Sequence, residues 1–276
     1  LASIHKERCT ALYGVPTMFI AELHHPMFDL FDMSCLRTGI MAGSLCPVEL
    51  MKQVEEKMYM KVTSVYGLTE AAPGMTATRI DDSFDVRCNT VGRDFEFTEV
   101  KVIDPETGEE CPVGVQGEMC NRGYNTMKGY YKNPEATAQI IDANGWLHTG
   151  DLGTIDDEGY VTVRGRSKNL LLTSSGQNIY PEEIESKLTN MPYVAESLIV
   201  LQHDKLVALI YPDFDDAFAH GMEQSDIEKV MEDNRNELNL QLPAYSQITK
   251  VKIHFEEFEK TAKKSIKRFM YQEVKG

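Results

Sequence analysis

The chain has 276 residues, of which 42% are hydrophobic and 26% are charged, the balance of a soluble globular protein with one large domain or two ordinary ones. Its 43 acidic residues outnumber 28 basic ones, and the net charge of −15 argues against binding to nucleic acid. No apolar run approaches the roughly 20 residues needed to cross a bilayer, and the first residues lack the pattern of a signal peptide, so we expect a cytoplasmic protein without an integral membrane segment.

Residues 1–70 alternate between strand and helix patterns. Strands are expected at residues 9–13, 36–42 and 61–66. Helices are expected to begin at Pro16 and Pro47, because proline suits the first position of a helix. This alternation predicts a mostly parallel sheet with helices packed on it.

Residues 71–167 are mostly β in pattern, with short alternating segments at residues 99–103 and 160–163. The turn at residues 104–108 has the required chemistry, because a proline presets φ and a glycine supplies the positive value. We expect a small β-barrel or sandwich here.

Residues 168–276 read as a compact α+β unit. A helix is expected from Pro181, a β-hairpin from residues 195–201 and 206–211, and a last strand at residues 251–255. Ser225 is expected to open a further helix through a capping box.

Six cysteines are spaced without a CxxC pair and without a histidine at ligand spacing: Cys9, Cys35, Cys46, Cys88, Cys111 and Cys120. We therefore expect reduced and mostly buried thiols rather than a metal site or a disulfide framework.

Three polar or aromatic residues follow the third expected strand, where parallel sheets usually bind ligands. The ring of Tyr66 can stack on an adenine, Thr69 can hold a phosphate, and Glu70 can hold a Mg²⁺ ion that bridges phosphate oxygens. The alternative is a simple turn with a capping threonine.

Asp151 follows a Thr-Gly pair that forces a tight turn, so we expect its carboxylate to be presented rather than buried, where it can accept two vicinal ribose hydroxyls. Arg166 could reach the same ribose or a phosphate. The alternatives are a turn aspartate and a surface arginine. Gly176 either forms a turn or lets an extended ligand pass close to the backbone.

At these residues the chain resembles the AMP-forming acyl-CoA synthetases, whose superfamily also holds luciferases and the adenylation domains of peptide synthetases. Residues 66–70 are similar to the YGxTE motif, residues 128–137 to KGYxxxPEAT, residues 146–151 to WxxTGD, and residues 165–185 to GRxK…GxNIxPxEIE. The resemblance covers essentially the whole chain.

The resemblance implies a fold of α/β plus β-barrel plus α+β type. Residues 1–167 would be the C-terminal part of the large AMP-binding domain, with residues 1–70 α/β and residues 71–167 mostly β. Residues 168–276 would be the small, mobile C-terminal domain. The implied reaction joins a carboxylate to ATP, giving an acyl-adenylate and pyrophosphate, and then lets the thiol of coenzyme A displace AMP.

By residue-wise carry-over, Tyr66 and Gly67 would border the adenine, Thr69 would bind the phosphate, and Glu70 would hold Mg²⁺. Thr69 and Glu70 would thereby take part in catalysis. Asp151 would bind the ribose with help from Arg166.

The remaining implied roles concern the acyl group, coenzyme A and domain rotation. Gly43 and Ser44 would border both the nucleotide and the acyl group, and the acyl pocket would be bordered by Tyr13, Gly14 and Val15. Lys168 occupies the hinge position, and Gly176 would line the approach of coenzyme A.

Two departures from the family pattern affect these expectations. The phosphate loop of the form TSGTTGxPK is absent from the sequence, so the chain resembles the C-terminal half of a ligase of roughly double the length, with the N-terminal half of the same protein missing. We expect this chain alone not to turn over. In the near-terminal motif PxTxxGKIxR, Ser265 falls at the position of the lysine, and we expect Lys264 to serve in its place.

The expected substrate is a medium- or long-chain fatty acid, because the residues bordering the acyl pocket are small and apolar; a visit to a membrane surface would suit such an enzyme. Two alternatives stay open: an adenylating enzyme that loads an acyl carrier protein, and a non-catalytic protein that binds nucleotide or acyl-CoA.

Overall fold

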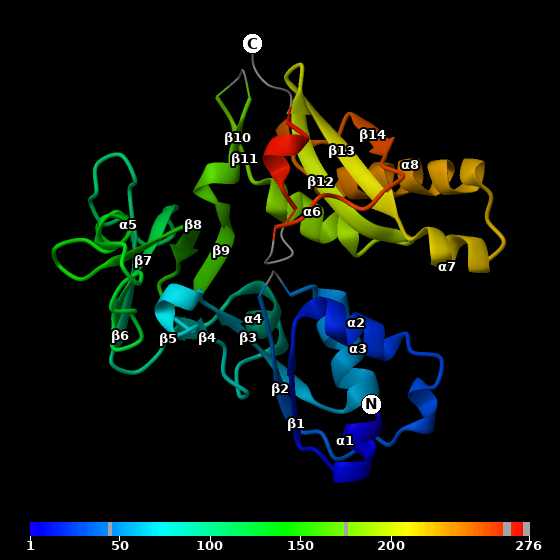
Figure 1. Ribbon diagram of the computed structural model, residues 1–276, viewed down its shortest axis with the longest axis horizontal. Coiled ribbons are helices and arrows are strands. Elements are labelled where there is room, and N and C mark those ends of the chain that lie inside the picture. Colours follow the sequence, from blue (N-terminus) through cyan, green and yellow to red (C-terminus); the bar gives the residue numbers. More distant parts are fainter. Residues whose placement is uncertain (44–45, 174–175, 262–265, 273–276) are drawn as a thin grey trace. The chain divides into compact units, whose positions relative to one another are not determined.

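The computed structural model describes residues 1–43, 46–173, 176–261 and 266–272 (Figure 1). The chain divides into two compact units, Leu1–Ser167 and Lys168–Gly276. Ser44, Lys264 and Ser265, all named in the sequence expectations, lie outside the described residues.

The first part of unit 1 alternates strands and helices as expected. Its elements are α1 (Ala2–Glu7), β1 (Ala11–Gly14), α2 (Pro16–Leu23), the 3-10 helix η1 (Phe28–Leu30), β2 (Thr38–Ala42), α3 (Val48–Met58) and β3 (Lys61–Tyr66). Strands β1, β2 and β3 are parallel neighbours, with Leu12 opposite Gly39 and Gly39 opposite Val62. The expected parallel sheet is confirmed.

Helices α2 and α3 supply much of the core of this part, and they contact each other beside the parallel strands (Figure 1). The buried side chains include Phe19 of α2, Met51 and Val54 of α3, and Met41 and Val62 of the sheet. The four-residue spacing of the apolar residues in α3 places them on the face that packs against this core.

The same sheet continues through two short antiparallel strands, β4 (Thr76–Ala77) and β5 (Arg93–Asp94). The 3-10 helix η2 (Thr69–Ala71) lies between β3 and β4, and helix α4 (Phe84–Asn89) lies between β4 and β5. Buried Arg87 of α4 donates to the carbonyl oxygen of Val62 at 2.9 Å, which attaches this helix to β3.

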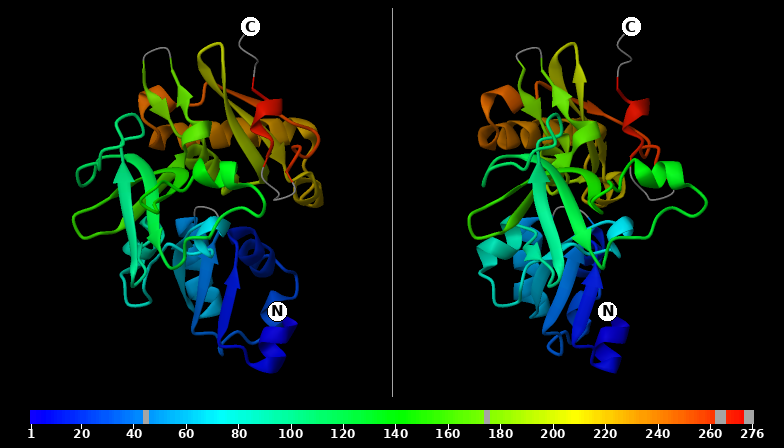
Figure 2. Two further views of the ribbon diagram at one scale, coloured as in Figure 1. Left: turned by 60° about the vertical axis from the view of Figure 1, so that its left-hand side comes forward. Right: turned by 90° about the vertical axis from the view of Figure 1, so that its left-hand side faces the viewer.

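A second sheet of unit 1 contains β6 (Thr98–Ile103), β7 (Gly117–Gly123), β8 (Leu147–Ile155) and β9 (Val161–Arg166), and the short helix α5 (Pro134–Ala138) lies between β7 and β8 (Figure 2). All neighbouring strands are antiparallel, in the order β6-β7-β8-β9. The expected turn after β6 is confirmed: Gly108 has φ +73° and its amide donates to Asp104 at 2.8 Å.

The mixed fold class is confirmed, but the expected barrel is not closed. Among the described residues, β6 and β9 have no ladder with each other, so the β region is an open sheet of sequential neighbours. Four strands are fewer than the roughly five to eight that close the small barrels. An open sheet with one buried face and a closed barrel give the same alternation in sequence, which is why the pattern did not separate them.

Unit 2 begins with the 3-10 turn η3 (Ser167–Asn169), which straddles the boundary, and contains a short hairpin, a three-stranded sheet and several helices. Its further elements are β10 (Leu171–Leu172), β11 (Asn178–Ile179), α6 (Pro181–Thr189), β12 (Val194–Gln202), β13 (Lys205–Pro212), α7 (Phe214–Ala219), α8 (Gln224–Gln241), η4 (Ala244–Ser246), β14 (Lys250–Ile253) and η5 (Arg268–Met270). Strands β12 and β13 are antiparallel, and β14 is parallel to β13.

The three-stranded sheet of unit 2 is covered on both faces. Ile199 and Ile210 share one core with α6 and α8, whereas Leu198 and Leu209 share another with Phe258. Because successive residues of a strand point to opposite faces, a continuous apolar run fills both cores. The expected hairpin is confirmed, with His203 and Asp204 at its tip, both with positive φ.

Two sequence expectations in unit 2 were wrong in detail. Helix α8 is capped by Glu223 and Asp226, whose side chains satisfy each other's backbone amides, rather than by Ser225. The acid at the earlier position reaches the first free amides, so Ser225 lies inside the first turn. The last strand ends at Ile253, and the ring of Phe255 stacks on Phe214 at 6.1 Å instead of continuing the strand.

Candidate functional site

The site in unit 1 is organised around a contact between two motifs that are distant in sequence. Tyr66 is the last residue of β3, and its hydroxyl donates to Oδ2 of Asp151 on β8 at 2.7 Å. Arg166, at the end of β9, is the cross-strand partner of Asp151, and its Nε lies 3.1 Å from Oδ1 of that carboxylate. Both oxygens of Asp151 are therefore held by named partners.

A β-bulge positions Asp151. On β7, Cys120 is opposite His148 and Glu118 is opposite Leu152, so two residue steps on β7 face four on β8. The extra residues belong to Thr149-Gly150-Asp151, and Gly150 adopts φ +71°. The amide of Gly150 donates to Glu118 at 2.9 Å. Bulges bend a strand locally and redirect side chains, which explains why a Thr-Gly-Asp sequence occurs here.

Thr149 completes the bulge from inside the sheet. Its buried hydroxyl donates to the carbonyl oxygen of Met119 at 2.7 Å and accepts the amide of Asp151 at 3.0 Å. The expectation that Asp151 would be presented to solvent is wrong, because this residue is only 6% exposed. Tyr66 and Arg166 lie against the carboxylate, and the tight turn alone did not reveal them.

Burial and charge both act on Tyr66. Burial of its phenol, and secondly the negative charge of Asp151, raise the pKa of Tyr66 above its usual value. The phenol therefore stays protonated at neutral pH and acts as a hydrogen-bond donor to the carboxylate. Arg166 has a side chain that is 63% exposed, so one side of the cluster can be reached by a ligand.

The loop after β3 contains two further expected site residues. Gly67 must be glycine, because a Cβ atom there would lie 1.9 Å from the carbonyl oxygen of Pro73. Thr69 begins η2 and is exposed. Oε1 of Glu70 accepts the hydroxyl of Tyr130 at 2.7 Å, and the backbone oxygen of Glu70 accepts the amide of Met127 at 2.8 Å.

Tyr130 is a site neighbour that the sequence reasoning did not single out. It lies in the KGYxxxPEAT segment, residues 128–137. The hydrogen bond to Glu70, followed by desolvation, raises the pKa of Tyr130. No spacing in the sequence reveals this contact, because Tyr130 and Glu70 are 60 positions apart.

The expected acyl-pocket residues lie at the ends of β1 and β2. Tyr13 and Val15 are 62% and 40% exposed. Gly43 follows β2 with φ +89°, and a Cβ there would lie 3.1 Å from Cγ1 of Val15. The structure therefore brings Gly43 and Val15 together, as expected for the carboxyl ends of adjacent parallel strands. Gly14 packs near Phe19 of α2.

Two expected site residues lie in unit 2. Lys168 is the first residue of this unit and lies exposed in η3. Gly176 has φ +77° and its amide donates to Thr173 at 2.9 Å, so it forms part of the loop between β10 and β11. The turn interpretation of Gly176 fits this geometry, and its open surroundings leave the backbone accessible.

The basic segment near the C-terminus is attached to unit 2 by ion pairs. Arg268 contacts Glu185 of α6, and Lys260 contacts Glu196 of β12. Ile266 forms a bridge with Lys260. Ile266 and Arg268 match the last two defined positions of the near-terminal family motif, and both contact other described residues of unit 2.

The structure corrects the expectation about cysteines in two respects. All six thiols are free, but only Cys120 is buried and the other five are half-buried. Sγ of Cys120 lies 3.7 Å from Nδ1 of His148, although these residues are 28 positions apart. Sequence spacing did not reveal this histidine, because the two residues meet as cross-strand partners on β7 and β8.

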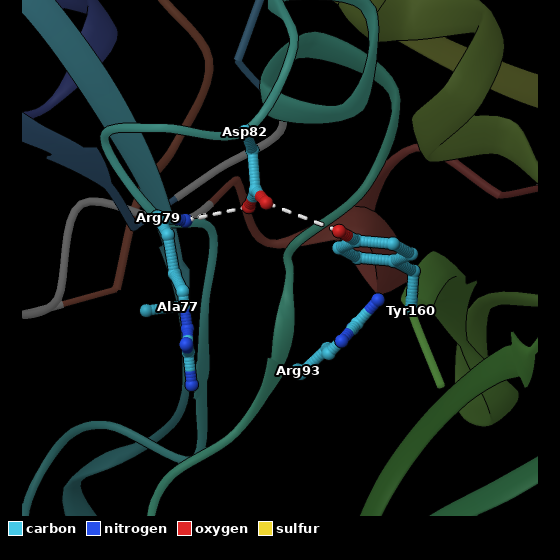
Figure 3. Close-up of a pocket in the computed structure, with 5 residues that line it drawn as sticks. All are labelled: Ala77, Arg79, Asp82, Arg93 and Tyr160. Atoms are coloured by element: carbon cyan, nitrogen blue, oxygen red, sulfur yellow. Dashed lines mark hydrogen bonds between the residues drawn. The ribbon is translucent and has the colours of Figure 1, made fainter. Parts of the chain in front are cut away.

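A small cavity of about 20 Å³ lies elsewhere in unit 1 (Figure 3). Asp82 accepts the amide of Arg79 at 2.7 Å and the hydroxyl of Tyr160 at 3.0 Å, and the guanidinium of Arg93 lies 4.2 Å from the ring centre of Tyr160. This space suits about one water molecule, whereas ligand pockets measure roughly 300–1,000 Å³. None of the expected site residues lines it.

Trp146 of the WxxTGD motif packs against neighbouring side chains. Lys101 and Arg122 lie 4.1 and 4.5 Å from its ring centre, so cations cover the aromatic ring. A hollow of about 290 Å³ next to it is lined mostly by charged side chains. Tyr66 therefore remains the aromatic residue of the candidate nucleotide site.

Within the described part of the chain, no helix has both the length and the apolar character needed to span a membrane.

Comparison with known proteins places the chain in a family. Residues 1–131 match the AMP-binding enzyme family, and residues 168–273 match the AMP-binding enzyme C-terminal domain. YngI of Bacillus subtilis, named as an acyl-CoA synthetase, is 54% identical over 201 residues, which cover 72% of this chain and 36% of YngI. Medium-chain acyl-CoA ligase ACSF2 of Rattus norvegicus is 38% identical over 201 residues, covering 72% of this chain and 32% of that protein.

The fold gives the same result. The anthranilate CoA ligase AuaEII, solved in complex with anthranoyl-AMP, matches with a TM-score of 0.80 at 27% identity, covering 98% of this chain and 49% of that chain. The chain belongs to the AMP-binding enzymes of the adenylate-forming superfamily, and the two relatives named above are an acyl-CoA synthetase and an acyl-CoA ligase. It spans about a third of the length of the two curated relatives.

Proposed function

We propose that the protein activates a carboxylic acid with ATP to an acyl-adenylate and then transfers the acyl group to coenzyme A, releasing AMP and pyrophosphate. The observation that carries this proposal is the contact of Tyr66 with Asp151, joined by Arg166. Tyr66 and Asp151 belong to different family motifs and are 85 positions apart in the sequence. Together with Arg166 they form one polar cluster.

In this proposal the cluster binds the nucleoside part of ATP. The ring of Tyr66 stacks on the adenine, and Asp151 accepts the ribose hydroxyls with Arg166 beside it. The Tyr66 hydroxyl and the Gly150 bulge fix the direction of the Asp151 carboxylate before ligand arrives. Preorganisation of this kind lowers the cost of ordering the site on binding.

The residues near η2 suit the phosphates and a magnesium ion. Thr69 is exposed and offers a hydroxyl and an amide to a phosphate. Glu70 provides the carboxylate oxygens that Mg²⁺ prefers, and Tyr130 orients that carboxylate through its hydrogen bond. When bound, Mg²⁺ neutralises phosphate charge. The role of this chain is to keep Glu70 and Thr69 next to Tyr66, which the short loop around Gly67 achieves.

Lys264 remains our proposal for the cation that contacts the carboxylate and the α-phosphate. The support is its place in the sequence, directly before the Ser265 that falls at the lysine position of the motif, together with the length and flexibility of a lysine side chain. A positive charge at this point would stabilise the charge that develops as the acid attacks phosphorus. Rotation at Lys168 and an approach of coenzyme A along Gly176 complete the proposed cycle.

We propose a medium- or long-chain fatty acid as the substrate. Val15 and Gly43 lie together at the ends of β1 and β2, Tyr13 is exposed at the end of β1, and this partly exposed surface suits an alkyl chain. The name of ACSF2, a medium-chain acyl-CoA ligase, agrees with this class. A cytoplasmic location stays a prediction, and ACSF2 is named as mitochondrial.

The test uses the complete protein and fatty acids of graded chain length. Pyrophosphate exchange measures adenylation, and AMP release with and without coenzyme A measures thioester formation. A ligase shows exchange without coenzyme A and AMP release that depends on coenzyme A. A carrier-loading enzyme shows exchange but no response to coenzyme A. The absence of exchange with every acid contradicts both and leaves a nucleotide- or acyl-CoA-binding protein.

Two variants connect the assay to the proposed site. Asp151→Ala should lower exchange by at least about 10-fold, because it removes the ribose contact. Asp157→Ala is the matched control, since Asp157 is an exposed residue between β8 and β9. The expectation that the 276 residues do not turn over alone stays a prediction, which the same assay tests.

A further inference from the structure

Three side chains of types that can ligate metals converge on one face of the β6–β9 sheet. Glu118 and Cys120 are two residues apart on β7, and His148 is the cross-strand partner of Cys120 on β8. Their ligand atoms, a carboxylate oxygen, a sulfur and an imidazole nitrogen, all lie within 4.8 Å of one another. A strand alternates its faces, so residues at positions i and i+2 and a cross-strand partner point to the same side.

The distances between these atoms match the edges of a tetrahedral zinc site. Zinc bonds of about 2.3 Å to sulfur and about 2.0–2.1 Å to nitrogen and oxygen place sulfur and nitrogen about 3.6 Å apart, and nitrogen and oxygen about 3.3 Å apart. Here Sγ of Cys120 lies 3.7 Å from Nδ1 of His148. Nδ1 of His148 lies 3.1 Å from Oε2 of Glu118.

The surroundings orient two of the three side chains as ligands require. Oε1 of Glu118 accepts the amide of Gly150 at 2.9 Å, which directs Oε2 toward His148. Nε2 of His148 lies 4.0 Å from Oδ2 of Asp142. In metal sites the second nitrogen of a ligating histidine usually donates to a carboxylate, and Asp142 is the carboxylate on that side of His148.

We propose that Glu118, Cys120 and His148 bind one Zn²⁺ ion, with water as the fourth ligand. A thiolate, an imidazole and a carboxylate together favour zinc over magnesium or calcium, which prefer oxygen ligands alone. The ion can enter from solvent, because the side chains of His148 and Glu118 are 31% and 18% exposed while Cys120 is buried. This inference goes beyond the proposed ligase activity.

Binding has a defined proton balance. The thiol of Cys120 loses its proton to the buffer as the Zn–S bond forms, and one water molecule completes the coordination. Binding through Nδ1 requires the tautomer of His148 that carries its proton on Nε2, the nitrogen on the side of Asp142. Oxidation states do not change, because Zn²⁺ has no redox chemistry at this site.

The experiment measures metal binding directly on the complete protein after removal of metals with a chelator. Titration calorimetry with Zn²⁺ should show one tight site. Co²⁺ in place of Zn²⁺ should give the sulfur-to-cobalt charge-transfer absorption that only thiolate ligation produces. Cys120→Ala should abolish this absorption and weaken Zn²⁺ binding by at least about 10–100-fold. Cys111→Ala is the matched control, since Cys111 is half-buried and is not part of the cluster.

A second variant covers the case in which Cys120→Ala does not fold. Asp142→Asn can keep an oxygen at the position of Oδ1, which accepts the amides of Asn144 and Trp146. It replaces Oδ2, the oxygen that faces His148, by an NH₂ group. It should lower Zn²⁺ affinity by about 10-fold and leave the thiolate absorption in place. Any of three results would overturn the proposal. The thiolate absorption could survive in Cys120→Ala, it could be lost equally in Cys111→Ala, or the wild-type protein could lack a stoichiometric Zn²⁺ site. None of these results depends on ligase activity.

Discussion

The hydroxyl of Tyr66 donates to the carboxylate of Asp151 at 2.7 Å across 85 positions of sequence. This bond joins the end of a strand of the parallel part of unit 1 to a bulge in its antiparallel sheet. The effect is mutual: the tyrosine orients the carboxylate, while burial of the phenol, followed by the charge of the carboxylate, raises the pKa of Tyr66 and keeps it protonated. The proposed nucleotide site therefore depends on the correct packing of two sheets against each other.

Removal of the Tyr66 hydroxyl should weaken nucleotide binding while keeping the aromatic ring. In Tyr66→Phe we expect the KM for ATP to rise about 10-fold, because a hydrogen bond to a charged group contributes about 1.5–3 kcal/mol and Arg166 still holds the other oxygen. Tyr59→Phe is the control, since Tyr59 is 66% exposed. An unchanged KM in Tyr66→Phe would show that the bond does not organise the site.

The Tyr130–Glu70 contact leads to a prediction about magnesium. Tyr130→Phe removes the donor that lies 2.7 Å from Oε1 of Glu70, so the carboxylate loses its orientation but keeps its charge. We expect the Mg²⁺ concentration for half-maximal activity to rise by a few-fold, with a loss of stability below about 1 kcal/mol for this exposed pair. Tyr131→Phe changes the adjacent, 88% exposed tyrosine and should leave the Mg²⁺ dependence unaltered. Equal effects of the two variants would disprove the orienting role.

Gly67 allows a close approach of two backbone segments, and replacing it should displace the site. In Gly67→Ala the new Cβ meets the carbonyl oxygen of Pro73 at 1.9 Å, so one of the two segments must move. We expect a loss of about 1–3 kcal/mol in the free energy of unfolding and weaker ATP binding. Gly108→Ala separates steric clash from backbone strain, because its φ is +73° but its Cβ meets no atom within 4 Å. A loss no larger than that of Gly108→Ala, measured by urea denaturation, would argue against the clash.

Much of the fold could be predicted because the deciding signals are local. Helix α2 begins at Pro16, where the sequence placed it, and β3 ends at Tyr66. Proline at a first helical position and apolar spacing act over a few residues, so they can be read without knowledge of the rest of the chain. The open form of the β6–β9 sheet could not be read, because closure depends on whether its outer strands meet.

The candidate site was only partly predictable for a related reason. Tyr66 and Asp151 were identified from their motifs, but the burial of Asp151 depends on partners from two other strands. The pair of Cys120 with His148 gave no signal at all, since cross-strand neighbours 28 residues apart have no fixed sequence spacing. Residue types predict chemistry, whereas the register of strands decides which chemistries meet.

Glu185 makes the stability of the protein depend on pH in a direction opposite to that of most acids. Its Oε1 accepts the amide of Ile199 at 2.6 Å and its other oxygen contacts Arg268, but burial dominates and raises the pKa of this carboxyl to about 7. The folded state therefore holds the proton more tightly than the unfolded chain, where the pKa is about 4.3. The contribution of Glu185 to stability is complete below about pH 4.3 and is lost as the pH rises to about 7.

Glutamine cannot ionise, so the difference in unfolding free energy between wild type and Glu185→Gln should shift by about 1–3 kcal/mol against wild type between about pH 5 and pH 7. Urea denaturation of both proteins across this range measures it, with Glu237→Gln on the exposed side of α8 as the control. A difference that does not vary with pH would mean that Arg268 keeps Glu185 ionised throughout.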